Sequence, residues 1–404
     1  MISHYMRRLE FVSVCLLFIS ITASAQTADS IHSQTTPQLI QLDMAPNFVF
    51  QTKDFLKGEN LKHKKIDQSL SFHLKYAFQF AHDSYFGQLY PNTYQGVGVS
   101  YNTFFNSSEV GNPIAIYVFQ GSRIAELSQR LSLDYEWNFG ASFGWKPHDE
   151  NKNVFNDVVG SRINAYINLG LYLNWRLNGN WNMKAGIAAT HYSNGNTRFP
   201  NAGVNLIGTR IGLSHTFEAI RTHTGKYGKQ ADITKAENPY WCFDAVAYGA
   251  TRTKGIVSEN YLVPGSFGVC GVNINPMYSI CKYFKAGLSL DGQYDESANL
   301  DKHIAGNDEN DNGILKFYRQ PLSERLGIGL SMRAEFVMPV FSINFGIGHN
   351  FIYKGDDLKG FYEILALKTF ITRHIFVHTG YLLNKFHDPK NLMIGFGYRF
   401  GGCK

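Results

Sequence analysis

Residues 131–145 read LSLDYEWNFGASFGW, with an apolar or aromatic residue at every odd position. Successive side chains of a β-strand point to opposite faces, so the odd-numbered residues share one face: Leu131, Leu133, Tyr135, Trp137, Phe139, Ala141, Phe143 and Trp145. The even positions include Asp134, Glu136 and Asn138. Carboxylates are costly in a dry interior, whereas a water-filled lumen would solvate them. The stretch therefore predicts a strand in the wall of a transmembrane barrel, with its apolar face toward lipid.

The same alternation recurs along the chain over about ten residues, the length of strand that crosses a bilayer at a tilt. Clear examples are 70–80, 163–175, 326–338, 341–347 and 392–400. We count about fifteen such segments between Ser69 and Phe400, and the apolar residues of 41–50 could supply one more. The sequence therefore predicts an all-β fold, an antiparallel transmembrane β-barrel of about 12–16 strands.

The connections between these segments fall into two alternating classes. Short connections are expected at 178–180, 276–281, 372–374 and around Pro339, and longer ones at 147–160, 194–203, 252–265, 293–323, 354–360 and 385–390. Short turns face the periplasm and long loops face outside in barrels of this kind. Connections 81–93 and 218–239 fall on the short side but are longer than a periplasmic turn requires.

Two consecutive barrels of about eight strands each, divided at 218–239, would satisfy the same strand count. We favour a single wall, because that linker would have to lie between two closed walls in one membrane. The predicted organisation is then a signal peptide at 1–25, an N-terminal segment at 26–60 that could supply the first strand, and a barrel at 61–404.

The beginning of the chain predicts export. Arg7 and Arg8 precede an apolar run, and Ala23-Ser24-Ala25 follows it, a small-x-small pattern typical of a cleaved signal peptide. Beyond this leader no run of about 18 apolar residues could form a membrane helix. The rest of the composition, 15% aromatic residues and 38 glycines at a mean hydropathy of −0.21, is typical of an outer-membrane barrel. Composition alone leaves a secreted, soluble all-β protein as the alternative.

Several other classes of function find no support in the sequence. The net charge of +6 is modest and no basic run or nucleic-acid motif is present. HIAGNDENDNG at 303–313 lacks the ligand spacing of an EF-hand, so we predict no metal and no organic cofactor. Oligomeric state is left open. Four cysteines follow the leader and leave three disulfide pairings open: Cys242, Cys270, Cys281 and Cys403.

The stretch 181–205, WNMKAGIAATHYSNGNTRFPNAGVN, raises a separate question. Its odd positions carry Trp181 and a series of apolar residues, and then His191 and Ser193 continue the same outward face near the outer leaflet. Asn205, on the returning strand, falls on that face too. Polar side chains facing lipid are costly, so this group requires an explanation.

Catalysis is one explanation. A serine hydroxyl becomes a nucleophile when an imidazole takes its proton, and a third group fixes the imidazole. His191 and Ser193, two residues apart on a strand, would have Cα atoms about 7 Å apart, and Asn205 could hold the second ring nitrogen. Residues of the loop that could donate hydrogen bonds to an oxyanion are Asn194, Asn201 and Gly203. The alternative is that the pair lies in an aqueous loop and has no chemical role.

HYSNGNTRFPNAGVN resembles the motif of the lipid A 3-O-deacylase family, outer-membrane barrels also called acyloxyacyl hydrolases, whose signature is His-x-Ser-Asn followed by Pro-Asn. The resemblance implies that Ser193 is the nucleophile, that His191 is the base and that Asn201 helps to form the oxyanion hole. It also implies an active site on the outer surface of the barrel, with the acyl chains of lipid A or lipopolysaccharide as substrate. Arg198, in the motif loop, could meet the lipid A phosphates.

One position departs from the family pattern. Where the family carries a glutamate in the next strand, this chain has Asn205, and an amide can orient an imidazole without stabilising its charged form. A catalytically inactive or passive porin-like barrel is therefore the alternative to an esterase. The family members first described are shorter, so the C-terminal half is an extension to which the motif assigns no function. GNPIAIYVFQG and HDPKNLMIGFGYRF are also similar to longer members of the group.

Overall fold

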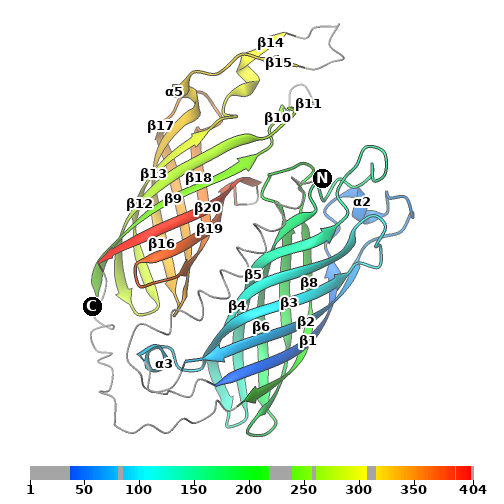
Figure 1. Cartoon of the computed structure of the whole chain (residues 1–404), viewed down its shortest axis with the longest axis vertical. Coiled ribbons are helices and arrows are strands. Elements are labelled where there is room, and N and C mark those ends of the chain that lie inside the picture. The colour runs from blue at the N-terminus through cyan, green and yellow to red at the C-terminus, as the bar shows by residue number, and fades with distance from the viewer. Residues whose placement is uncertain are drawn as a thin grey trace, which may run out of the picture.

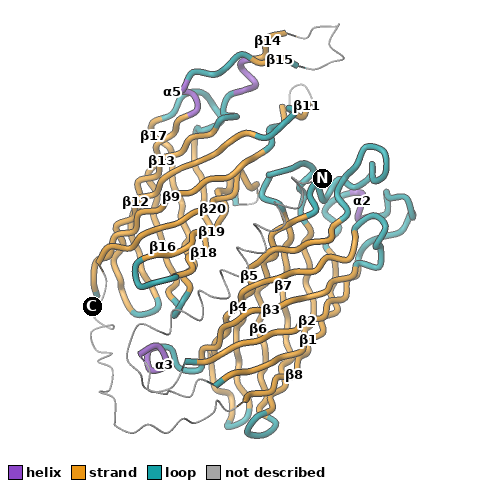
Figure 2. Tube along the Cα trace, in the orientation of Figure 1, coloured by secondary structure: helices purple, strands orange, loops and turns teal. Residues whose placement is uncertain are grey.

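The computed structural model describes residues 37–80, 85–217, 239–256, 261–306, 315–386 and 388–401. Over these residues the chain forms two closed antiparallel barrels of eight strands each, which lie side by side (Figure 1). Strands make up most of both bodies, and the short helices lie in the connections (Figure 2). The predicted signal peptide at 1–25 and Cys403 lie outside the described residues.

The first barrel closes when its last strand pairs with its first, opposing Gln38 to Phe217. Its strands follow the chain order: β1 (Gln38–Val49), β2 (Gln68–Gln79), β3 (Thr93–Thr103), β4 (Gly111–Ser128), β5 (Leu131–Trp145), β6 (Ile163–Arg176), β7 (Trp181–Ser193) and β8 (Val204–Phe217). Helix α2 (Asp54–Lys57) follows β1, and helix α3 (Tyr85–Leu89) follows β2.

The second barrel closes between β9 and β20, which oppose Gly249 to Ile394. Its strands are β9 (Tyr240–Arg252), β12 (Phe267–Cys281), β13 (Phe284–Asp295), β16 (Leu326–Val337), β17 (Phe341–Ile352), β18 (Gly360–Phe370), β19 (Ile375–Asn384) and β20 (Asp388–Gly401). The connections carry two small hairpins and two short helices: β10 (Gly255–Ile256) with β11 (Tyr261–Leu262), β14 (Ile304–Gly306) with β15 (Lys316–Phe317), η2 (Leu300–His303) and α5 (Leu322–Arg325). Among the described helices none is long and apolar enough to cross a membrane.

The all-β, antiparallel barrel class is confirmed, and two sets of eight strands give the upper end of the expected strand number. The single wall is wrong, and the division at 218–239 that we did not favour is the correct one. β8 ends at Phe217 and β9 begins at Tyr240, and each pairs within its own barrel. Alternation reports which face of a strand is apolar, but it does not encode which strand closes the wall. Segment 26–60 contributes β1, and 61–404 contains the rest of both barrels.

Two local expectations also require correction. Residues 276–281 continue β12, with Pro276 opposite Phe243, so the turn lies between Cys281 and Phe284. Trp145 points into the first barrel instead of outward, because Gly144 has a φ of +95° and interrupts the alternation of β5. The indole Nε1–H of Trp145 donates to Ser142 Oγ at 2.9 Å.

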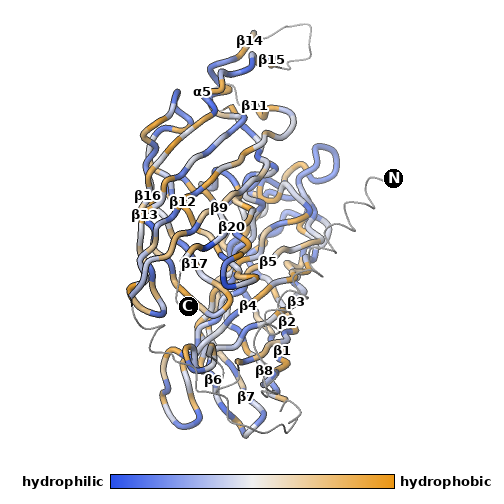
Figure 3. The backbone as a smooth tube through the Cα atoms, turned by 60° about the vertical axis from the view of Figure 1, so that its left-hand side comes forward, coloured by the Kyte–Doolittle hydropathy of each residue, from blue (hydrophilic) through white to orange (hydrophobic). Residues whose placement is uncertain are grey.

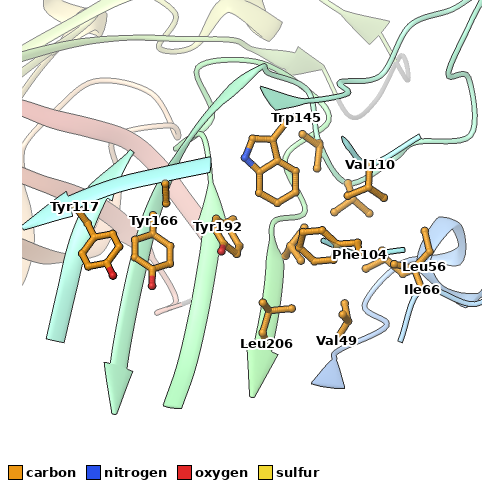
Figure 4. Packing of buried hydrophobic residues seen from close by; sticks show 14 of the residues in the cluster. Val49, Leu56, Ile66, Phe104, Val110, Tyr117, Trp145, Tyr166, Tyr192 and Leu206 are labelled. Atoms are coloured by element: carbon orange, nitrogen blue, oxygen red, sulfur yellow. The ribbon is translucent and has the colours of Figure 1, made fainter. Parts of the chain in front are cut away.

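The outward faces of both barrels are apolar along most strands, and hydrophobic and hydrophilic residues alternate along the wall (Figure 3). On β6, for example, the outward leucines at 169, 171 and 173 are exposed while Tyr166 and Tyr172 are buried inside. The interior of the first barrel near the end of β7 holds an aromatic and aliphatic cluster (Figure 4). Tyr192 points into this cluster and its hydroxyl donates to Asn102 Oδ1 at 3.0 Å, so His191 and Ser193 point the other way.

Both lumens contain buried ion pairs. In the first barrel, Lys75 contacts Asp43 at 2.7 Å and also pairs with Glu136, which is fully buried. In the second, Asp244 contacts Lys368 at 2.8 Å and Arg399 at 2.7 Å. The interior of an eight-stranded barrel is just wide enough for side chains to fill it. The inward direction of Glu136 is therefore as predicted, and neighbouring cations compensate its charge.

The barrels pack directly on each other through their outer faces. Trp137 of β5 contacts Phe341 with ring centroids 4.9 Å apart, and its Nε1–H points at Met338 Sδ at 3.3 Å. Leu367 of β18 joins this cluster. Trp137, expected to face lipid, is therefore buried by the second barrel. The turn at Met338–Phe341 of the second barrel lies against the middle of β5 of the first barrel, so the two barrels are offset. Residues in the middle of strands of the second barrel therefore lie next to strand ends of the first barrel.

Candidate active site

Strands β7 and β8 bring His191, Ser193 and Asn205 together. His191 lies directly opposite Asn205 in the register of the two strands, and Ser193 is the last residue of β7 on the same outward face. His191 Nδ1 lies 2.6 Å from Asn205 Oδ1, and His191 Nε2 lies 2.9 Å from Ser193 Oγ. The amide oxygen can only accept, so Nδ1 carries the ring proton and Nε2 accepts from the Ser193 hydroxyl. The pair thus belongs to a strand end and not to an aqueous loop.

Asparagine side chains hold the loop that follows β7. Asn201 Oδ1 accepts from the Asn194 N–H at 2.9 Å, and Asn201 Nδ2 donates to Asn196 Oδ1 at 3.1 Å. Asn194 Nδ2 in turn donates to the carbonyl of Arg198 at 2.8 Å, while the Arg198 side chain is exposed. The donor groups that the sequence assigns to an oxyanion, the Asn194 N–H and the side-chain amides of Asn194 and Asn201, therefore each donate to a partner within the loop and help to fix its shape.

Gly203 lies against the imidazole at the other end of the loop. Its φ is +73°, and a Cβ built there would lie 3.0 Å from the Tyr192 carbonyl and 3.1 Å from His191 Cε1. A glycine fits this left-handed conformation without steric cost and leaves room for the ring. The structure therefore places Gly203 at His191, where its lack of a side chain is used.

The second barrel covers the site, which the sequence did not indicate. Ser193 is 4% exposed although it lies on the outer face of the first barrel. The Tyr381 hydroxyl of β19 lies 3.4 Å from Ser193 Oγ. Asn196 Nδ2 donates to the carbonyl of Pro389, and the Thr253 N–H donates to the Asn196 carbonyl at 2.9 Å. Residues of the HDPKNLMIGFGYRF segment are among those that cover Ser193. Nothing in the spacing of the sequence predicts that this segment lies near residue 193.

No metal site accompanies these residues in the described ranges, where no group of three or more His, Cys, Asp or Glu side chains could hold an ion. Three of the cysteines are described, and all are free thiols: Cys242, Cys270 and Cys281.

Two protein-family models match the chain, one over each barrel. The family model for lipid A 3-O-deacylase matches residues 62–214, and that for the C-terminal domain of acyloxyacyl hydrolase matches residues 241–402. The chain belongs to the lipid A 3-O-deacylase family. The first range covers β2 to β7 and most of β8 of the first barrel, and the second covers nearly all of the second barrel, so the C-terminal extension is itself a domain of this family. The family also places the chain in the outer membrane.

Solved structures of outer-membrane barrels resemble this chain at low identity. Neisserial surface protein A is 9% identical, covering 45% of this chain and 97% of its own, with a TM-score of 0.31. The outer membrane enzyme PagL is 16% identical, covering 43% of this chain and 97% of its own, with a TM-score of 0.28. The siderophore receptor PirA from Acinetobacter baumannii is 8% identical, covering 88% and 68%, with a TM-score of 0.24. A search of curated proteins finds no match.

Proposed function

We propose that the protein is an outer-membrane serine esterase that removes an ester-linked acyl chain from lipid A in the outer leaflet. The observation that carries the proposal is the hydrogen-bonded chain from Ser193 Oγ through His191 to Asn205. It lies on the outer face of a barrel wall within the range that matches the lipid A 3-O-deacylase model. We also propose that residues 1–25 are removed during export.

The reaction follows from the three side chains. Ser193 Oγ attacks the ester carbonyl carbon as its proton passes to His191 Nε2, and the carbonyl π electrons move to the oxygen. Collapse of the tetrahedral intermediate breaks the bond to the sugar oxygen, which takes the proton from His191. Water then repeats these steps and releases the fatty acid. Asn205 holds Nδ1 and so keeps Nε2 facing Ser193.

The wall below the site suits an acyl chain. Ile187 on β7 and Ile207 on β8 are exposed on the same outward face as His191. Ala189, directly opposite Ile207, lies between Ile187 and His191 along β7. An acyl chain lying along this apolar strip would bring its ester to the level of Ser193 without leaving the hydrocarbon layer.

A passive porin-like barrel is the alternative function. It requires a conducting lumen, whereas the first barrel holds Lys75, Asp43 and Glu136 in buried ion pairs across its interior. Wide aqueous channels are a property of barrels with about sixteen strands in one wall. The filled interiors favour the esterase over the porin, and an assay separates the esterase from an inactive barrel.

Fatty acid release from lipid A tests the esterase directly. We expect the purified protein in detergent to release fatty acid, detected by mass spectrometry, and Ser193→Ala to reduce release by at least about 10³-fold because no nucleophile remains. The intact mass of the same sample should correspond to a chain that begins at Gln26. Equal release by the protein and by Ser193→Ala, or none from several lipid A forms and phospholipids, would favour an inactive barrel.

Substitution of Gly203 should damage the site through the backbone. In Gly203→Ala the new Cβ meets the His191 ring in a left-handed conformation, which costs about 1 kcal/mol and displaces the imidazole. We expect kcat to fall about 10-fold or more while the barrel stays folded, as judged by heat-modifiable migration on gels. Gly179→Ala, in a turn where nothing lies within 4 Å of the new Cβ, is the control. Equal activity of both variants would contradict this role for Gly203.

The exposed Arg198 is proposed to contact a lipid A phosphate. Such a contact contributes equally to the ground state and the transition state, so Arg198→Ala should raise KM for lipid A about 5- to 20-fold with little change in kcat. The same variant should leave hydrolysis of an uncharged ester substrate unchanged. A KM effect of equal size on the uncharged ester would rule out phosphate recognition.

A further inference from the structure

A tyrosine of the second barrel lies at the nucleophile of the first. Tyr381 belongs to the outward-facing residues of β19, yet it is 6% exposed because the first barrel covers it. Its hydroxyl lies 3.4 Å from Ser193 Oγ, a long hydrogen-bond distance. Since a buried tyrosine hydroxyl normally has a hydrogen-bond partner, Ser193 is the group that fills this role here.

The close approach depends on Gly195, two residues after the serine. A Cβ on Gly195 would lie 2.6 Å from Leu392 Cγ and 2.9 Å from Tyr381 Cε1, and the φ of Gly195 is +63°. Leu392 and Tyr381 are opposite each other in the register of β19 and β20. Because Gly195 has no side chain, β19 and β20 can pack directly against the motif loop. The ring of Tyr381 is held in place by packing against Gly195.

The other hydrogen bond of Ser193 Oγ determines which hydroxyl donates in the contact between Tyr381 and Ser193. Ser193 Oγ donates its proton to His191 Nε2, so toward Tyr381 it can only accept, and the Tyr381 hydroxyl is the donor. The Asn194 N–H and both polar atoms of the Asn201 side chain are already paired inside the loop. Among the described residues, Tyr381 is therefore a hydroxyl donor within reach of the position where negative charge develops.

We propose that Tyr381 is a catalytic residue supplied by the second barrel. Its hydroxyl donates a hydrogen bond to Ser193 Oγ before attack and to the oxyanion of the tetrahedral intermediate after it. No proton is transferred from Tyr381, so the proton path through His191 is unchanged. The active site is then complete only where the two barrels meet, and the acyl ester lies between them. This inference rests on the proposed esterase function.

The test compares Tyr381→Phe with the full-length parent protein. Phenylalanine keeps the ring that packs on Gly195 and removes only the hydroxyl. We expect kcat for lipid A to fall about 10- to 100-fold with KM within about 2-fold, since loss of one oxyanion donor typically has effects of this order or larger. The rate at which a fluorophosphonate probe labels Ser193 should fall to a similar extent. Tyr398→Phe, on the outward face of β20 and 41% exposed, is the matched control and should change neither rate.

The probe separates this inference from the esterase proposal, because labelling requires a reactive serine but no lipid A turnover. Equal labelling and turnover by Tyr381→Phe and the parent would overturn the role of Tyr381 while leaving the esterase intact. Labelling of Ser193 without lipid A turnover, slowed by Tyr381→Phe, would support Tyr381 and contradict lipid A as substrate. A parent protein whose Ser193 is not labelled would overturn both.

Discussion

Asn205→Asp is expected to raise kcat for lipid A by roughly 10- to 10³-fold. The reason is electrostatic, because the imidazolium formed during attack has only a neutral amide beside it at 2.6 Å. Exchanging the carboxylate of a serine protease triad for its amide lowers kcat about 10⁴-fold, and the reverse exchange should recover part of that. Aspartate has the size of asparagine, so it needs no repacking.

A matched control separates the local charge effect from a general one. Asn178, in the turn before β7, also uses its Oδ1 only as an acceptor, from the backbone N–H groups of Asn180 and Trp181. Asn178→Asp adds the same charge to the same barrel far from His191 and should leave kcat within about 2-fold. If Asn205→Asp is folded and no faster than the parent, the amide does not limit the reaction, and the proposed role of position 205 is wrong.

Glu335→Ala is expected to be the most destabilising single change that the second barrel offers. Glu335 is fully buried in the lumen, where it pairs with Lys368 and, at 2.7 Å, with Arg399. Its removal leaves two buried cations with Asp244 as their remaining partner, and breaking a buried ion pair typically costs about 3–5 kcal/mol. We expect the midpoint of urea unfolding in detergent to fall accordingly.

An exposed ion pair in the same barrel provides the comparison. Asp356 pairs with Lys302, and both side chains are largely in solvent. Asp356→Ala should cost no more than about 1 kcal/mol, because solvent screens exposed pairs. Equal effects of the two substitutions on the unfolding midpoint would mean that the lumen is hydrated and that Glu335 is not compensated by its neighbours.

Much of the wall could be predicted from local patterns. Alternation in 131–145 identified β5 and the inward direction of Asp134 and Glu136, because a strand exposes successive residues on opposite faces. The alternation gave the wrong face for Trp145, because Gly144 has a left-handed conformation and turns the following side chain inward. The alternation also could not assign strand partners. Closure of two barrels is a property of long-range pairing between β1 and β8 and between β9 and β20, which periodicity does not contain.

Some residues of the candidate site could likewise be predicted from the sequence, and others could not. His191, Ser193 and Asn205 could be identified from sequence because they lie on one strand and on the strand paired with it, where register fixes their distances. Tyr381 lies 188 positions beyond Ser193, and its approach depends on how two separate walls pack. The loop asparagines were predicted as donors to an oxyanion, but their bonds to one another follow from a loop conformation that residue types alone do not specify.

Detection of an acyl-enzyme would test whether Ser193 becomes acylated by lipid A. The parent protein would be mixed with lipid A, quenched in acid within the first turnovers, digested and analysed by mass spectrometry. We expect an acyl ester on the peptide that contains Ser193, and none on the same peptide of Ser193→Ala. Fatty acid release without acylation at Ser193, or acylation at another residue that persists in Ser193→Ala, would contradict it.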